Sequence, residues 1–89
     1  MKERTMDGKR VAVIFFEKRV DAIWVLTQMK KLIAKDRFVT VGDYYDLASQ
    51  EDFIGDDRFG WNDLTGVVAV KTGGRYILIL PDVIARPEE

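Results

Sequence analysis

The pattern of apolar and polar positions divides the chain into four candidate elements. Residues 11–16 (VAVIFF) are a short apolar run rich in β-branched and aromatic side chains, which predicts a strand buried on both faces. Residues 19–35 carry apolar side chains at intervals of three and four, which predicts the main helix. The stripe expected to face the core comprises Ala22, Val25, Leu26, Met29, Leu32 and Ile33.

The opposite side of this helix carries Val20 and Trp24, with Ile23 flanking them. A tryptophan opposite the core stripe needs a partner, and two readings stay open. Either a neighbouring segment of the same chain covers it, or a second protein chain does. Because exposed aromatic side chains are favoured anchors of interfaces, Val20, Ile23 and Trp24 are candidate partner-binding residues.

A second, shorter helix is predicted over residues 41–49. Thr40 is a good N-cap residue and Asp43 follows three positions later, close to a capping box. Two tyrosines of this helix can bury their rings while their hydroxyls reach hydrogen-bond partners. One face of the helix would carry Val41, Tyr44, Tyr45 and Ala48.

Residues 67–72 and 75–80 predict a β-hairpin, because Gly73-Gly74 supplies the positive φ angles that a two-residue turn requires. Both faces are apolar, so we expect both to be covered. The main helix would cover one face, and residues 59–64, the second helix or another subunit the other. The two faces carry Val68, Val70, Ile77 and Ile79, and Val67, Ala69, Leu78 and Leu80, respectively.

The stretch FGWNDL (residues 59–64) leads directly into this hairpin, and its Asn62-Asp63 pair favours a turn. We expect Trp61 to fold over a sheet face that would otherwise be bare. The alternative is a surface-exposed tryptophan that binds a partner.

Together these elements predict a single α+β domain over residues 1–89, with an antiparallel sheet of about three strands (11–16, 67–72 and 75–80) packed on the main helix. No apolar run approaches the roughly 20 residues of a membrane helix. The charged first ten residues lack the apolar core of a secretory signal, so we expect a cytoplasmic location.

The net charge of −1 conceals an uneven distribution of charges along the chain. Residues 1–38 carry ten Lys or Arg and five acids, whereas residues 39–63 carry seven acids and one Arg. Such asymmetry indicates a polar interaction surface or simply solvated loops. We take Asp56 and Asp57, in the acidic stretch 51–57, as candidate residues for electrostatic fit to a partner.

Several stretches together are similar to a group of small uncharacterised bacteriophage and prophage proteins. They are VTVGDYYDL (39–47), FGWNDL (59–64), the valine-rich strand after it and GRYILILP (74–81), and the resemblance spans about residues 13–82. It implies a phage or prophage setting and no particular activity or site. Ile23 and Trp24 stand where that pattern has charged residues, and Ser49 stands near its usual glycine.

The composition leaves few routes to catalysis. The chain has no histidine and no cysteine, so thiolate metal sites and Ser–His or Cys–His nucleophiles are excluded. Asp56-Asp57, with Glu51 and Asp52, offer oxygen ligands for Mg²⁺ or Ca²⁺ but do not match the calcium-loop spacing. We therefore predict a non-enzyme without cofactor, with a metal-dependent hydrolase as a minor alternative.

The predicted function is protein–protein contact, with another protein or with a second copy of this chain. The alternative is a nucleic-acid-associated regulator, because residues 40–48 resemble the first helix of a helix-turn-helix and a hairpin follows as a wing would. The acidic stretch EDFIGDD after it would repel phosphates, which argues against direct DNA reading.

Overall fold

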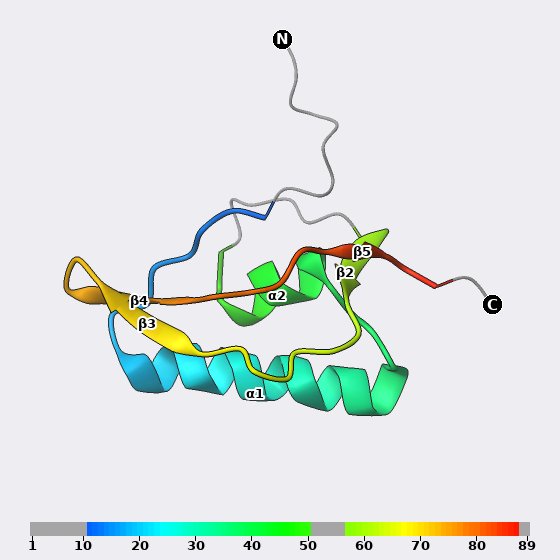
Figure 1. The fold of residues 1–89 in the computed structure, drawn as a ribbon, viewed down its shortest axis with the longest axis horizontal. Coiled ribbons are helices and arrows are strands. Elements are labelled where there is room, and N and C mark those ends of the chain that lie inside the picture. Colours follow the sequence, from blue (N-terminus) through cyan, green and yellow to red (C-terminus); the bar gives the residue numbers. More distant parts are fainter. Residues whose placement is uncertain (1–10, 51–56, 88–89) are drawn as a thin grey trace, which may run out of the picture.

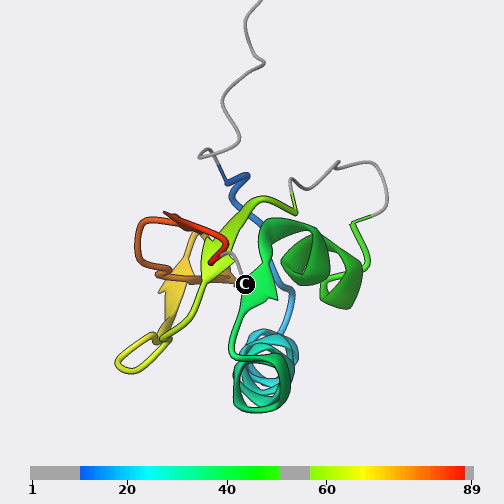
Figure 2. The ribbon, with the colours of Figure 1, turned by 90° about the vertical axis from the view of Figure 1, so that its right-hand side faces the viewer.

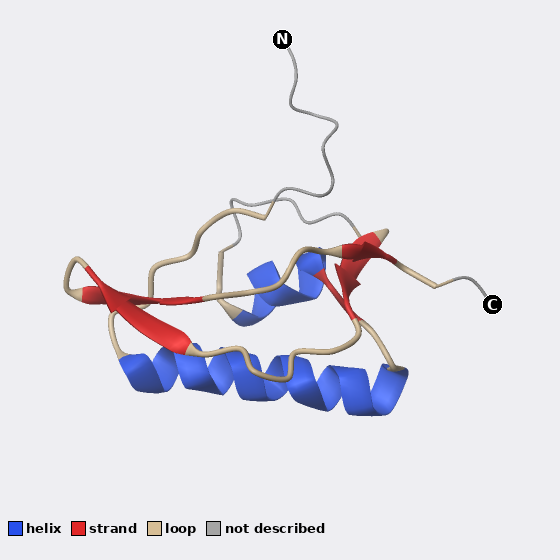
Figure 3. Ribbon diagram, viewed as in Figure 1, coloured by secondary structure: helices blue, strands red, loops and turns tan. Residues whose placement is uncertain are grey.

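The computed structural model describes residues 11–50 and 57–87 of the 89-residue chain and has a mixed α+β architecture (Figures 1 and 3). The predicted fold class is therefore confirmed. In chain order the elements are α1 (Arg19–Asp36), β1 (Val39–Thr40), α2 (Val41–Leu47), β2 (Phe59–Trp61), β3 (Ala69–Thr72), β4 (Arg75–Leu78) and β5 (Ile84–Ala85). One sheet has the strand order β1-β2-β5 and the other is the hairpin β3-β4, both antiparallel.

Helix α1 forms as the apolar periodicity predicted and extends one residue further. The helix ends where the Arg37 N–H donates a hydrogen bond to the Ile33 carbonyl (2.7 Å). Figure 2, which looks along α1, shows α2 and the hairpin on two sides above it. The residues of α1 that this arrangement buries are Ala22, Val25, Leu26 and Met29.

Helix α2 is fixed at both ends by local hydrogen bonds. At its start, the Asp43 N–H donates to Thr40 Oγ1 (3.0 Å) and the Thr40 N–H donates to Asp43 Oδ2 (3.1 Å), which confirms the capping box. At its end, the Gln50 N–H donates to the Tyr45 carbonyl (2.9 Å) and the Ser49 N–H to the Asp46 carbonyl (3.1 Å). These two bonds form a Schellman motif, so the helix stops at Leu47 rather than at residue 49.

The hairpin β3-β4 has the predicted register, with Ala69 opposite Leu78 and Val70 opposite Ile77. Gly73 and Gly74 have φ angles of 59° and 82°, the left-handed values that this two-residue turn requires. The regular strands are shorter than predicted at their outer ends, although the Ile79 N–H still donates to the Val68 carbonyl (3.1 Å).

The predicted strand 11–16 is wrong. Only Phe16 joins the hairpin, through a single bridge to Tyr76 in which each N–H donates to the other carbonyl at 2.8 Å. Upstream of Phe16 the Ala12 N–H donates instead to the Tyr45 hydroxyl (2.9 Å), which draws this segment towards α2. The segment is also buried on one face only, because Ile14 and Phe16 are buried whereas Val13 and Phe15 are exposed.

The sheet β1-β2-β5 was not predicted, because strands of two or three residues are too short to show an alternating pattern. Its centre is β2, which brings Trp61 into the core. The indole Nε1–H donates to the Pro81 carbonyl (2.8 Å), and the ring meets Tyr44 edge-on with centroids 5.9 Å apart. Trp61 is therefore a buried structural residue, as expected, and not a binding tryptophan.

The turn after Trp61 also forms as predicted. The Thr65 N–H donates to Asp63 Oδ1 (2.9 Å), and this hydrogen bond lowers the pKa of the Asp63 carboxyl.

Within the described residues the chain itself covers one face of the hairpin, and coverage of the other face by a second subunit stays a prediction. Leu78 is buried against the core, and Val67, Ala69 and Leu80 pack on it from the same side. On the outer face Val68, Val70 and Ile79 stay exposed, because α1, α2 and β2 all lie on the inner side. Within the described residues the fold is thus built around one core cluster beneath the hairpin.

Candidate functional site

The outer side of α1 carries the largest exposed side chain of the helix. Trp24 is 52% exposed and Val20, one turn before it, is 66% exposed, whereas Ile23 is partly buried. Within the part of the chain that the structure describes, no segment covers Trp24. Of the two readings of this tryptophan, coverage by its own chain therefore finds no support in the described residues.

Trp24 lies on the rim of a hollow of about 350 Å³, which we call the Trp24 hollow. Three segments form it: residues 14–17 before α1, the first half of α1, and residues 47–50 at the C-terminal end of α2. Because these segments are far apart in the sequence, the helical pattern of α1 alone could not predict the hollow. Val20 and Ile23 do not line it.

The C-terminal end of α2 gives the Trp24 hollow one of its walls. Leu47 and Ala48 contribute apolar surface there, and Ser49 and Gln50 contribute polar groups. Ser49 has a φ angle of 60°, a left-handed conformation that glycine adopts more readily.

Two carboxylates lie at the same hollow. Glu17 and Asp21 line it and both are exposed, so the rim around Trp24 is acidic. Sequence analysis did not select either residue. Asp21 stands three positions before Trp24, and this spacing places two residues on neighbouring parts of one helix face.

Phe15 is the second aromatic residue of the Trp24 hollow, and sequence analysis had assigned it to a buried strand. It is 46% exposed. The guanidinium of Arg75, on β4, lies over its ring at 4.8 Å from the centroid, a cation–π contact. Phe15 therefore connects the hollow with the exposed outer face of the hairpin.

The structure does not bring Asp57 to Trp24. Asp57 lies near the start of α2, where its Oδ1 accepts a hydrogen bond from Thr40 Oγ1 (3.4 Å), whereas the Trp24 hollow lies at the end of that helix. Asp56, the other acid of the predicted site, falls outside the described residues. Among the described residues, the acidic groups that line the Trp24 hollow are Glu17 and Asp21, and Asp57 is not one of them.

The described residues offer little to a metal ion. Within residues 11–50 and 57–87, no three Asp or Glu side chains come together as a candidate metal site. In the same residues no helix combines the length and the apolar character needed to cross a membrane.

Comparison of the chain with protein-family models, with characterised proteins and with solved structures found no match. A function therefore has to be argued from the geometry of the site itself.

Proposed function

We propose that this protein acts without catalysis, by binding another protein chain through the Trp24 hollow and the exposed side chains next to it. The observation that carries the proposal is the exposure of two large aromatic side chains, Trp24 and Phe15, at one hollow. Partly exposed aromatic residues at a concave site are typical anchors of protein interfaces. The resemblance to small phage and prophage proteins supports an accessory role in such a setting.

The charges around the hollow indicate what the partner presents. Glu17 and Asp21 favour a basic side chain beside an apolar one. Val20 extends the apolar contact along α1, and Ile23 borders it. The partner is another protein or a second copy of this chain.

The nucleic-acid alternative gains no support from a described element. A helix-turn-helix needs a recognition helix after its first helix. In the described residues the next element after α2 is strand β2. The C-terminal end of α2 lies beside the Trp24 hollow, where Glu17 and Asp21 would repel phosphates.

The test compares Trp24→Ala with Lys35→Ala, a control at an exposed position near the other end of α1. Tagged proteins are used to recover partners from bacterial lysate, and sedimentation velocity over a range of concentrations measures self-association. We expect loss of at least tenfold in recovered partner, or in dimer affinity, for Trp24→Ala and no change for Lys35→Ala. Because Trp24 is exposed, its replacement should leave the far-ultraviolet circular dichroism spectrum unchanged.

Equal recovery of partner by both variants would contradict the proposal. Retention of nuclease-sensitive material by both variants alike would favour the nucleic-acid alternative instead. A fluorescence measurement adds an independent control: acrylamide should quench Trp24 and leave the buried Trp61 protected, and a bound partner should protect both.

A further inference from the structure

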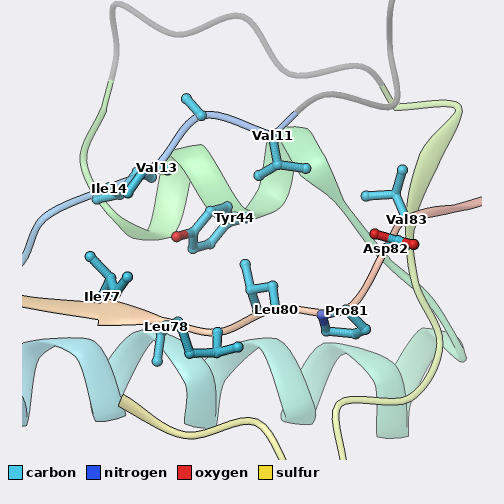
Figure 4. A pocket seen from close by; sticks show the side chains of 12 residues that line it. Val11, Val13, Ile14, Tyr44, Ile77, Leu78, Leu80, Pro81, Asp82 and Val83 are labelled. Atoms are coloured by element: carbon cyan, nitrogen blue, oxygen red, sulfur yellow. The ribbon is translucent and has the colours of Figure 1, made fainter. Parts of the chain in front are cut away.

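A second cavity shares Ile14 with the Trp24 hollow and is otherwise lined by different residues. It has a volume of about 360 Å³ and lies between residues 11–14 and residues 77–83 (Figure 4). We call it the strand gap. Its volume is near the lower end of the roughly 300–1,000 Å³ that ligand pockets occupy, so it suits a short occupant and not a folded domain.

The strand gap exists because a β-ladder begins and then stops. Phe16 and Tyr76 exchange two hydrogen bonds of 2.8 Å, and a continued antiparallel ladder would next pair Ile14 with Leu78. Among the described residues no hydrogen bond joins Ile14 to Leu78. The two segments separate because the Ala12 N–H is bonded to the Tyr45 hydroxyl of α2.

The separation leaves the edge of β4 and its continuation facing the gap. The backbone of Tyr76 points towards Phe16, and that of Ile79 points the opposite way, towards Val68. Backbone direction alternates along a strand, so the N–H and C=O groups of Leu78 and Leu80 point into the gap. Within the described chain no partner strand meets them on that side.

A buried hydroxyl also lines the gap. Tyr44 is only 2% exposed, and Figure 4 shows it between the two segments with its hydroxyl towards the end where Ile14 and Ile77 lie. In the described part of the chain this hydroxyl makes no hydrogen bond, whereas the neighbouring Tyr45 and Trp61 both have partners. Native proteins usually pair buried hydroxyls, so Tyr44 offers a hydrogen bond to an occupant. Burial raises the pKa of Tyr44 to about 12, so the phenol stays protonated at neutral pH.

We propose that the strand gap binds an extended peptide segment of a partner chain, which pairs with the edge at Leu78 and Leu80 and places an apolar side chain over Tyr44. A strand added to a sheet edge gains affinity from main-chain hydrogen bonds and specificity from pockets for alternate side chains. Of the described residues that line the gap, Asp82 is the charged one, and it lies exposed. Because Asp82 is negatively charged, we expect the partner's peptide segment to carry a basic residue next to its apolar one.

The test uses the full chain and a panel of acetylated and amidated peptides Lys-Val-Thr-X-Thr-Val, with Ala, Val, Leu or Phe at X. Binding is followed by nuclear magnetic resonance of the backbone amides and by their hydrogen exchange. We expect the amides of Leu78 and Leu80 to shift and to become at least tenfold slower in exchange. Peptides methylated on the backbone nitrogens that face the edge should not bind, because they cannot donate to it.

Three variants locate the site. Val11→Phe should weaken binding at least tenfold, because the Val11 side chain points into the gap in Figure 4 and a larger ring there would occupy it. Tyr44→Phe removes the hydroxyl and should weaken binding several-fold, and Asp82→Asn should reduce the salt dependence of binding. Trp24→Ala should bind the peptides as wild type does, since Trp24 does not line the gap. The Trp24→Ala variant therefore separates the two proposals: peptide binding at the strand gap can fail or succeed independently of partner binding at the Trp24 hollow.

Three results would overturn the proposal. The first is that no peptide of the panel shifts Leu78 and Leu80. The second is that methylated and unmethylated peptides bind alike. The third is that cyclohexanol, a small apolar alcohol, shifts these amides while the peptides do not, which would assign the gap to small molecules.

Discussion

Single atoms decide whether two of the glycines can be replaced. A Cβ added to Gly60 would overlap the Val39 carbonyl oxygen and lie 2.7 Å from Thr40 Cα, and both of these are backbone atoms of β1. A Cβ added to Gly42 would instead lie 2.7 Å from Asp57 Oδ1, the end of an exposed side chain that can move. An added methyl group therefore has to displace backbone at Gly60, but only a movable side chain at Gly42.

We expect Gly60→Ala to reduce the free energy of unfolding by about 3 kcal/mol, because β1 and β2 must separate to admit the methyl group. Gly42→Ala should change it by less than about 1 kcal/mol, since a better helix former replaces glycine in α2. Urea denaturation of both variants measures the difference. Equal destabilisation would contradict the close approach of β2 to β1.

Residue types also explain part of the site. Trp24 was selected from the sequence because it lies opposite the core stripe, and this inference needs only the helical period. Phe15 could not be selected, because an all-apolar run does not show which alternate residues face outwards. Its exposure follows from the single bridge at Phe16 and from the position of α1 and α2 on one side only.

At the scale of elements, α2 shows how local chemistry defines a helix. The capping box at Thr40 and Asp43 was visible in the sequence, because it depends on residue types three positions apart. The C-terminal end was not, because Ser49 adopts a conformation typical of glycine.

Ser49→Gly tests this end of α2. We expect it to raise the free energy of unfolding by about 0.5–1 kcal/mol, because the strain of a side chain at φ 60° exceeds the added entropy of the unfolded glycine. Ser49→Ala keeps the Cβ and serves as the control, with a change within about 0.5 kcal/mol. Urea midpoints at an unchanged slope measure both, and a destabilised Ser49→Gly would argue against the left-handed cap.

At the scale of the whole molecule, the burial of Tyr44 in the core makes the free energy of unfolding depend on pH in the alkaline range. Its pKa rises from 10.0 to about 12 mainly because burial disfavours the phenolate, with a smaller contribution from Tyr45. Below pH 10 the Tyr44 phenol is protonated in both the folded and the unfolded chain, so titration of Tyr44 takes nothing from the stability of the fold. Part of that stability is lost as the pH rises from 10 to 12, because the unfolded chain ionises first.

We expect the free energy of unfolding to fall by roughly 2–3 kcal/mol more in the wild type than in Tyr44→Phe between pH 10 and pH 12. The comparison cancels the lysines and arginines, which titrate in both proteins. Thermal or urea unfolding at several pH values provides the measurement. Parallel pH profiles would show that Tyr44 is not buried as the structure has it.

The sequence by itself determined α1, the start of α2, the hairpin with its register, and the place of Trp24 opposite the core stripe of α1. Each follows from a period, a cap or a turn within a few residues of the chain. Only the tertiary structure decided the sheet β1-β2-β5, the departure of residues 11–14 from the hairpin and the positions of Glu17 and Asp57 relative to Trp24. These depend on contacts between distant segments, such as the bond from Ala12 to Tyr45, for which no local pattern exists.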